Sequence, residues 1–138
     1  MVIATNHARF AITEALWSRG APWAVPLPWL IPPRVALESI VTADPIDAGC
    51  AHQVGLVNRV VPADELLDAA EAMAHRIIEN APLAVPAAKA MVHPSAEGGW
   101  SEALDEGCRL FEPVYLSEDA QEGPRALQEK RGPRWQGR

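Results

Sequence analysis

Apolar residues in the second half of the chain recur at helical spacing. Between residues 64 and 79 they form one continuous stripe of seven positions: Leu66, Leu67, Ala70, Met73, Ala74, Ile77 and Ile78. Such a stripe is typical of an amphipathic helix. Asp64 can cap the start of this helix, and Asn80 and Pro82 can end it. We therefore predict a helix over residues 64–79.

Two further segments of this half show helical patterns. Residues 83–92 suit a helix, because Pro86 would fall in its first turn, where proline is tolerated. A third helix follows Ser101 as its cap, with apolar residues at Leu104, Cys108, Phe111 and Tyr115 and an expected kink at Pro113. We predict an α-helical bundle of at least three helices in the second half of the chain.

The first half is rich in proline and predicts loops and short strands. Residues 9–13 alternate polar and apolar side chains, as in a half-buried strand. Pro26 and Pro28 would interrupt any helix, at about 3 kcal/mol each. Residues 33–41 predict a short helix that begins at a proline. We expect its buried side to consist of four apolar residues: Val35, Leu37, Ile40 and Val41.

Residues 42–62 contain several local signals within 21 positions. Asp47 precedes an Ala-rich run and is placed to cap a short helix. Gly55 can adopt the left-handed conformation that ends a helix. Residues 56–61 then read as a β-branched strand, and Pro62 ends it.

Composition narrows the class of protein. With 138 residues, 49% apolar and 22% charged, the chain fits one soluble domain or part of one. We expect no membrane span, since no run of 18 apolar residues occurs, and no signal peptide. Two cysteines without a CxxC motif suit a reducing, cytoplasmic location. The net charge of −6 argues against general nucleic-acid binding.

His52, His75 and His93 have no partners at ligand spacing, so we predict no metal site.

Two segments carry a resemblance to a known family, the enoyl-CoA hydratase/isomerase or crotonase family. The first segment keeps the family's spacing at Thr42, Pro45, Ile46, Ala48, Gly55, Leu56, Val57, Asn58, Val60, Val61 and Pro62, although Ala43 replaces the usual glycine. The second keeps it at Ser117, Glu118, Asp119, Ala120, Glu122, Gly123, Ala126, Glu129, Lys130 and Arg131, with Leu127 in place of the usual phenylalanine. The likeness covers nearly the whole chain but only about the C-terminal half of a family member.

The resemblance implies a fold and a set of partners. The fold class would be α/β, crotonase-like, represented by its C-terminal half. Residues 1–62 would be the remainder of a ββα core, and residues 63–138 a helical region for oligomerisation and for covering the active site. The expected partners are an acyl-CoA substrate and either further copies, as a trimer or hexamer, or a missing N-terminal half. No separate cofactor is implied, because coenzyme A is part of the substrate.

The resemblance also implies two site residues. Glu14, at the exit of the predicted strand, occupies the position of one of two catalytic acids. Adding water across a conjugated thioester needs a base for the water and an acid for the α-carbon, which two carboxyl groups with separated pKa values can supply. Lys130 occupies the position of a lysine that can approach the CoA phosphates. Its plain alternative is an exposed lysine at a helix end, favoured by the helix dipole.

Departures from the family pattern bear on activity. Residues 15–29 lack the family's paired glycines and contain Trp17, Trp23 and Trp29, which could line an acyl pocket or serve core or interface packing. No Gly-Gly-Gly-x-Glu-like motif occurs, and this motif carries the second acid in the half that also supplies the oxyanion-hole amides. Losing one such donor costs about 3 kcal/mol in the transition state. Two function classes therefore stay open: an acyl-CoA hydratase or isomerase, and a catalytically silent module for oligomerisation or CoA binding.

Overall fold

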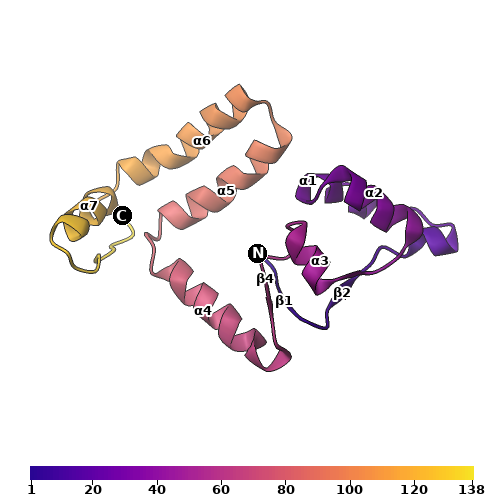
Figure 1. The fold of residues 1–138 in the computed structure, drawn as a ribbon. Helices are drawn as coiled ribbons and strands as arrows, with labels where there is room; N and C mark the ends of the chain where they lie inside the picture. Colours follow the sequence, from indigo (N-terminus) through magenta and orange to yellow (C-terminus); the bar gives the residue numbers. More distant parts are fainter. The chain divides into compact units, whose positions relative to one another are not determined.

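The computed structural model describes the main-chain elements of the chain and the side chains of residues 1–92 and 98–138. The chain forms two compact units, Met1–Ala72 and Met73–Arg138, which we describe one after the other (Figure 1). Helix α4 (Leu66–Ile78) runs across the boundary between them. The predicted division after residue 62 stays a prediction.

Short strands in the first unit form two separate pairs. Strand β1 (Ile3–Thr5) lies parallel to β4 (Arg59–Val61), and β2 (Arg9–Phe10) lies antiparallel to β3 (Ile46–Asp47). The strands predicted over residues 9–13 and 56–61 are therefore both shorter in the structure. In the second of them, the amides of Leu56 and Val57 donate to the carbonyl of Ala51, which ties these residues to the end of a helix and leaves only 59–61 for pairing.

The local signals of residues 42–62 are confirmed. The Asp47 side chain caps α3 (Ala48–Gln53) by accepting a 2.7 Å hydrogen bond from the Cys50 amide. Gly55 ends this segment with a φ of 87°, a conformation that glycine adopts without the steric cost of a Cβ atom. The small core of this unit forms where α3 meets the parallel strands: Ala4, Ala51 and Val57.

Helix α2 (Pro33–Thr42) begins at a proline, as predicted, but the face that it buries differs from the prediction. Its buried residues are Ala36 and Ser39, whereas Leu37 and Val41 are each 61% exposed. The prediction of Leu37 and Val41 as buried is therefore wrong, because small side chains let this helix approach its neighbours closely. Ala43 ends the helix with a φ of 60°, so it keeps the left-handed conformation for which the resemblance implies a glycine.

The segment between the strands and α2 consists of short turns. It contains the 3₁₀ turns η1 (Glu14–Trp17) and η2 (Pro22–Ala24) and one helical turn, α1 (Leu27–Leu30). This agrees with the expected interruption by Pro26 and Pro28, since no continuous helix forms across residues 22–30.

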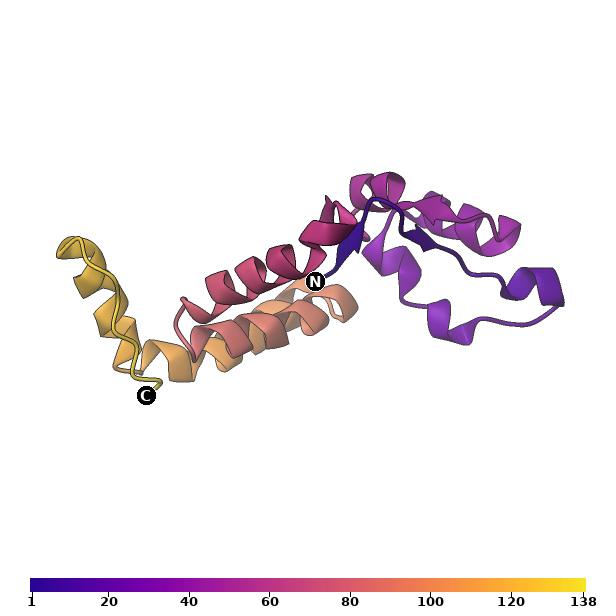
Figure 2. The same cartoon turned by 90° about the horizontal axis from the view of Figure 1, so that it is seen from below.

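The second half is helical, as predicted. Beyond α4 it contains α5 (Ala84–Glu97), α6 (Trp100–Tyr115) and α7 (Asp119–Gln128). Helices α5 and α6 pack side by side (Figures 1 and 2). Two predicted caps are wrong: Asp64 lies inside the 3₁₀ turn η3 (Ala63–Glu65), and Gly99 rather than Ser101 precedes α6.

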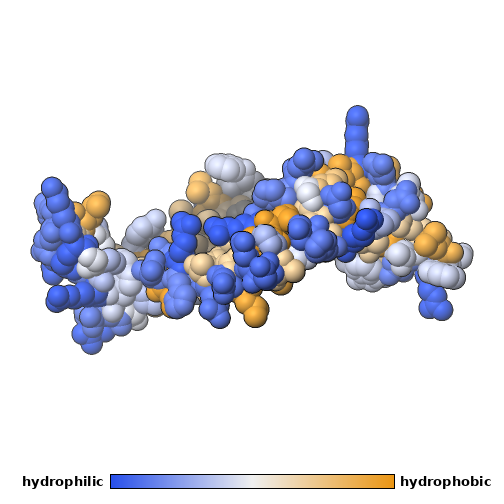
Figure 3. Space-filling view, turned by 60° about the horizontal axis from the view of Figure 1, so that its bottom comes forward, coloured by the Kyte–Doolittle hydropathy of each residue, from blue (hydrophilic) through white to orange (hydrophobic). Residues whose placement is uncertain are grey.

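The apolar stripe of α4 has no buried residue. One edge of the stripe is half-buried, whereas Leu67 and Ile78 on the other edge are 74% and 71% exposed. Apolar side chains reach the surface at several places on the face that Figure 3 shows. Among the described residues, no helix combines the length and apolar character that crossing a bilayer requires.

Candidate functional site

Glu14 lies at the start of η1, four residues after β2 ends. Ile12, two residues earlier, is buried and holds this part of the chain against the first unit. The Glu14 side chain is half-buried and makes no hydrogen bond or ion pair with another described residue. Its main-chain carbonyl accepts a 3.0 Å hydrogen bond from the Arg19 amide, which fixes the turn. This hydrogen bond thus fixes the main chain at Glu14 and not its carboxylate.

Three tryptophans follow Glu14, and none of them belongs to the core of the first unit. Trp17, Trp23 and Trp29 are between 61% and 71% exposed. Core packing in this segment comes from the smaller Ala24 and from Ile31 instead. The prediction that these tryptophans pack in the core is therefore wrong for this unit. Their alternative roles, lining an acyl pocket or packing at an interface between chains, stay predictions.

A second group of functional candidates lies around α7 and the residues that follow it. Ser117 is buried, and its hydroxyl accepts a 3.2 Å hydrogen bond from the Ala120 amide at the start of the helix. Asp119 is only 4% exposed, and its two carboxylate oxygens accept hydrogen bonds from the amides of Gln136 and Gly137, at 2.7 and 2.9 Å. These contacts hold the last residues of the chain against α7.

Glu122 and Gly123 add further contacts to the same tail. Glu122 pairs with the Arg131 guanidinium at 2.6 Å and accepts a second 2.6 Å hydrogen bond from the Arg134 amide. A Cβ atom at Gly123 would lie 3.4 Å from the Trp135 ring, so the glycine leaves room for that ring. The Trp135 indole donates to the Glu79 carbonyl at 2.8 Å, which links the tail to the end of α4. Residues of the second family-like segment therefore hold the C-terminal tail in place.

Lys130 sits at the turn between α7 and this tail. It has a left-handed φ of 54° directly after the C-cap residue Glu129, and its side chain is exposed without a partner among the described residues. A hollow of about 530 Å³ lies nearby, between α7 and the tail. Arginines and carboxylates line it together: Glu118, Asp119, Gln121, Glu122, Arg125, Arg131, Arg134 and Gln136. Lys130 is not among them and faces solvent.

The pairing around Glu122 has a consequence for pH dependence. Arg131 and the Arg134 amide stabilise the charged form and lower the pKa of Glu122 from 4.5 to about 2. Since the folded pKa is the lower one, this stabilisation is complete above about pH 4.5 and is lost as the pH falls toward 2. We expect the thermal midpoint to fall less across this range in Glu122→Gln than in the wild type, as measured by circular dichroism. Glu71→Gln, on an exposed position of α4, is the control, and parallel curves for all three proteins would contradict the prediction.

The structure places the two predicted site residues in different units, Glu14 in the first and Lys130 in the second. Each is described within its own unit, so their assignment to one site stays a prediction. The described side chains contain no group of three or more metal-ligating residues. His93 lies outside the described side chains, and the expected absence of a metal stays a prediction.

Comparison with known proteins establishes the class. The family model described as enoyl-CoA hydratase/isomerase matches residues 1–138. Among solved structures, an enoyl-CoA hydratase from Mycobacterium tuberculosis H37Rv superposes with a TM-score of 0.93 at 36% identity, covering 100% of this chain and 56% of that one. One from Bacillus anthracis gives a TM-score of 0.92 at 33% identity, covering 99% and 54%. The structure is thus the C-terminal half of a crotonase-like α/β fold.

The chain belongs to the enoyl-CoA hydratase/isomerase family. Curated relatives include the carnitinyl-CoA dehydratase of Salmonella arizonae, which is 37% identical over 142 residues, and that of Proteus mirabilis, which is 36% identical over 148 residues. The alignments cover 99% and 100% of this chain but 54% and 55% of the relatives. The chain therefore spans about half the length of the curated relatives that it matches.

Proposed function

We propose that this protein takes part in acid–base chemistry on an acyl-CoA thioester, either hydration of a 2-enoyl-CoA or migration of its double bond. The observation that carries the proposal is family membership over all 138 residues, combined with a half-buried carboxylate at Glu14 that has no partner among the described residues. The cytoplasm is the proposed location, and a trimer or hexamer the proposed assembly. Coenzyme A enters as part of the substrate, so the proposal includes no separate cofactor.

Glu14 is the proposed proton carrier. In hydration, a carboxylate takes a proton from the attacking water, and a carboxylic acid delivers a proton to the α-carbon of the thioester. Glu14 would serve one of these steps, and the second acid would come from outside these 138 residues. In isomerisation, a carboxylate removes a proton at one carbon and returns it at another, which a single Glu14 could perform. Both the acyl chain of the substrate and the choice between these two reactions stay open.

A second function stays a prediction beside the first. The chain spans about half of its curated relatives, and its sequence contains no Gly-Gly-Gly-x-Glu-like motif. Preorganised oxyanion donors are usually the largest single contribution to such catalysis. The alternative proposal is a catalytically silent module that binds CoA or associates with other subunits through its helices. A CoA-binding module would share the CoA contact with the first proposal and would differ from it in turnover.

Lys130 provides a test of the CoA contact, with a matched control in the same chain. The sequence contains two lysines, Lys130 and Lys89, and both are exposed. We expect Lys130→Ala to weaken binding of crotonyl-CoA about threefold to tenfold and to reduce its salt dependence, because one charge near the phosphates is lost. Lys89→Ala should leave binding unchanged. The measurement is isothermal titration at two salt concentrations.

Two outcomes of that titration count against the assignment. Binding that persists in Lys130→Ala with the same salt dependence would return this lysine to the role of an exposed helix-end residue. A wild-type chain that does not bind crotonyl-CoA would contradict CoA recognition by these 138 residues.

A further inference from the structure

Helix α7 ends at Lys130 in a conformation that usually belongs to glycine. The residue has a φ of 54°, and two main-chain hydrogen bonds close the turn around it. The Lys130 amide donates to the Leu127 carbonyl at 3.2 Å, and the Arg131 amide donates to the Ala126 carbonyl at 3.0 Å. This pair of bonds is the Schellman arrangement, whose left-handed residue is most often glycine because a Cβ atom is strained there. A lysine therefore occupies a turn that its own backbone preference does not favour.

The side chain of Arg131 joins the residues on both sides of this turn. Its guanidinium pairs with Glu122 and with Glu129, at 2.6 Å each, and donates to the Gly132 carbonyl at 3.0 Å. Glu122 lies in the first turn of α7, and Glu129 is the C-cap residue directly before Lys130. We call these contacts the Arg131 bridge. The bridge fastens the chain before and after Lys130 to the body of the helix.

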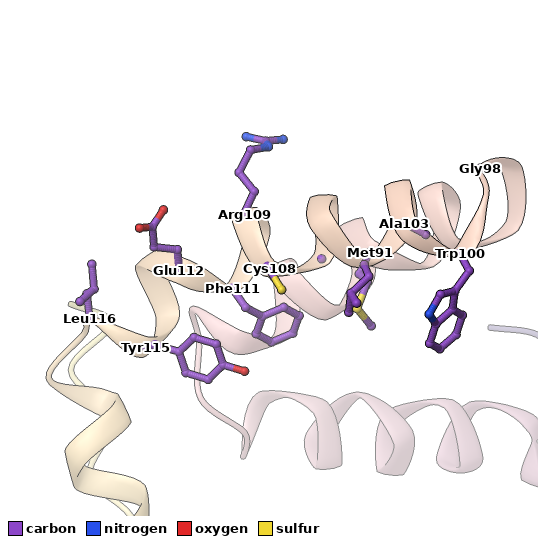
Figure 4. Close-up of a pocket in the computed structure, with 12 residues that line it drawn as sticks. Met91, Gly98, Trp100, Ala103, Cys108, Arg109, Phe111, Glu112, Tyr115 and Leu116 are labelled. Carbon is purple, nitrogen blue, oxygen red and sulfur yellow. The ribbon is translucent and has the colours of Figure 1, made fainter.

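A second arginine pair in this unit shows how sheltered the Arg131 bridge is. Arg109 on α6 pairs with Glu106 one turn away, and Figure 4 shows the Arg109 side chain projecting away from the aromatic rings of that helix. The Arg109 side chain is 68% exposed, whereas that of Arg131 is 29% exposed. Their carboxylate partners Glu106 and Glu122 differ in the same way, at 33% and 14% exposed. Exposed pairs within one helix contribute little to stability, so the sheltered bridge is the better suited of the two to hold a strained turn.

The two basic side chains at this turn differ in what they can still bind. The Arg131 guanidinium is occupied by two carboxylates and a carbonyl, so its charge is offset within the chain. The Lys130 side chain is exposed and has no partner among the described residues. A lysine ammonium group has three rotatable donors and a charge that suits phosphate oxygens. Lys130 is therefore the cation that this turn offers to a ligand.

We propose that Arg131 is a positioning residue, whose bridge holds Lys130 in the left-handed turn and so presents the Lys130 ammonium group to the phosphates of CoA. Fixing a cation before the ligand arrives reduces the ordering cost of binding. The identity of the ligand rests on the proposed function, whereas the bridge can be tested without any ligand. Arg131 itself does not contact CoA in this proposal, which separates its role from that of Lys130.

A substitution that keeps the charge separates positioning from simple attraction. Arg131→Lys retains a positive charge, but an ammonium group cannot form the fork that reaches two carboxylates. We expect isothermal titration to show crotonyl-CoA binding weakened about twofold to fivefold in Arg131→Lys and unchanged in the matched control Arg109→Lys. In the Lys130→Ala background, Arg131→Lys should have no further effect, because it acts through Lys130. Full affinity in Arg131→Lys, or an equal loss with and without Lys130, would overturn the proposal.

A ligand-free measurement tests the turn directly. In NMR spectra of the wild type, a left-handed Lys130 should give an intense NOE between its own amide and α protons, because a positive φ brings them close. This NOE should weaken in Arg131→Lys and persist in Arg109→Lys, and an unchanged NOE in Arg131→Lys would overturn the proposal. A wild-type chain that does not bind crotonyl-CoA would instead contradict the CoA contact of the proposed function, and the NOE would still decide whether Arg131 holds the turn.

Discussion

Replacing Asp119 by asparagine is expected to loosen the end of the C-terminal tail at Gln136 and Gly137 and to lower the free energy of unfolding by about 2–4 kcal/mol. The carboxylate is 4% exposed and accepts two main-chain amides, those of Gln136 and Gly137. Hydrogen bonds to a charged group contribute more than neutral ones, about 1.5–3 kcal/mol each. An asparagine of the same shape keeps one acceptor and turns a donor toward the other amide, so one contact is lost and its amide stays unpaired.

Denaturant unfolding and hydrogen exchange together measure this prediction. The unfolding midpoint should fall, and the Gln136 and Gly137 amides should lose their protection. Asp68→Asn is the control, because Asp68 is exposed on α4 and the substitution should change stability little. If Asp119→Asn and Asp68→Asn gave the same midpoint, Asp119 would not anchor the tail.

Features fixed by neighbouring residues could be predicted from the sequence. Asp47 caps α3 and Gly55 adopts its left-handed conformation within a few residues of one another. Pro33 similarly begins α2 where its missing amide and fixed φ suit a helix start. These features need no distant partner, so the local sequence contains all the information.

Burial could not be predicted in the same way, because it depends on what each face meets. The pattern of α2 favoured Leu37 and Val41 as buried, yet Ala36 and Ser39 occupy the contact. The stripe of α4 was correctly predicted as helical, but Leu67 and Ile78 on it are exposed. A hydrophobic period therefore predicted the helix, whereas only tertiary packing decides which apolar edge is covered.

The candidate site shows the same difference. Glu14 could be selected because its position matches a family pattern, and the structure adds that its carboxylate has no partner among the described residues. The roles of Asp119 and Glu122 were missed, although both lie in a segment that matched the family. Their partners are between nine and 18 residues further along the chain, so local pattern alone did not reveal them. An acidic segment followed by a basic tail was the available signal.

Catalysis provides the other large expected effect, since these 138 residues should not hydrate crotonyl-CoA by themselves. General acid–base catalysis by one positioned group contributes about 10²–10⁴-fold, and it needs a polarised carbonyl to act on. The chain contains Glu14 but no Gly-Gly-Gly-x-Glu-like motif. Without the amides that stabilise the oxyanion, the thioester carbonyl is not polarised, and a single carboxylate should accelerate the reaction little.

The test follows loss of the conjugated enoyl absorbance of crotonyl-CoA, first with the chain alone and then after mixing with the N-terminal portion of a family member. We expect no turnover alone. If mixing restores turnover, Glu14→Gln should reduce it by about 10²–10⁴-fold, because the amide cannot transfer the proton. Glu38→Gln, at an exposed position of α2, should have no such effect. Turnover by the chain alone that Glu14→Gln abolishes would overturn the expected silence and make these residues an enzyme in their own right, whereas turnover that survives Glu14→Gln would remove Glu14 from the mechanism.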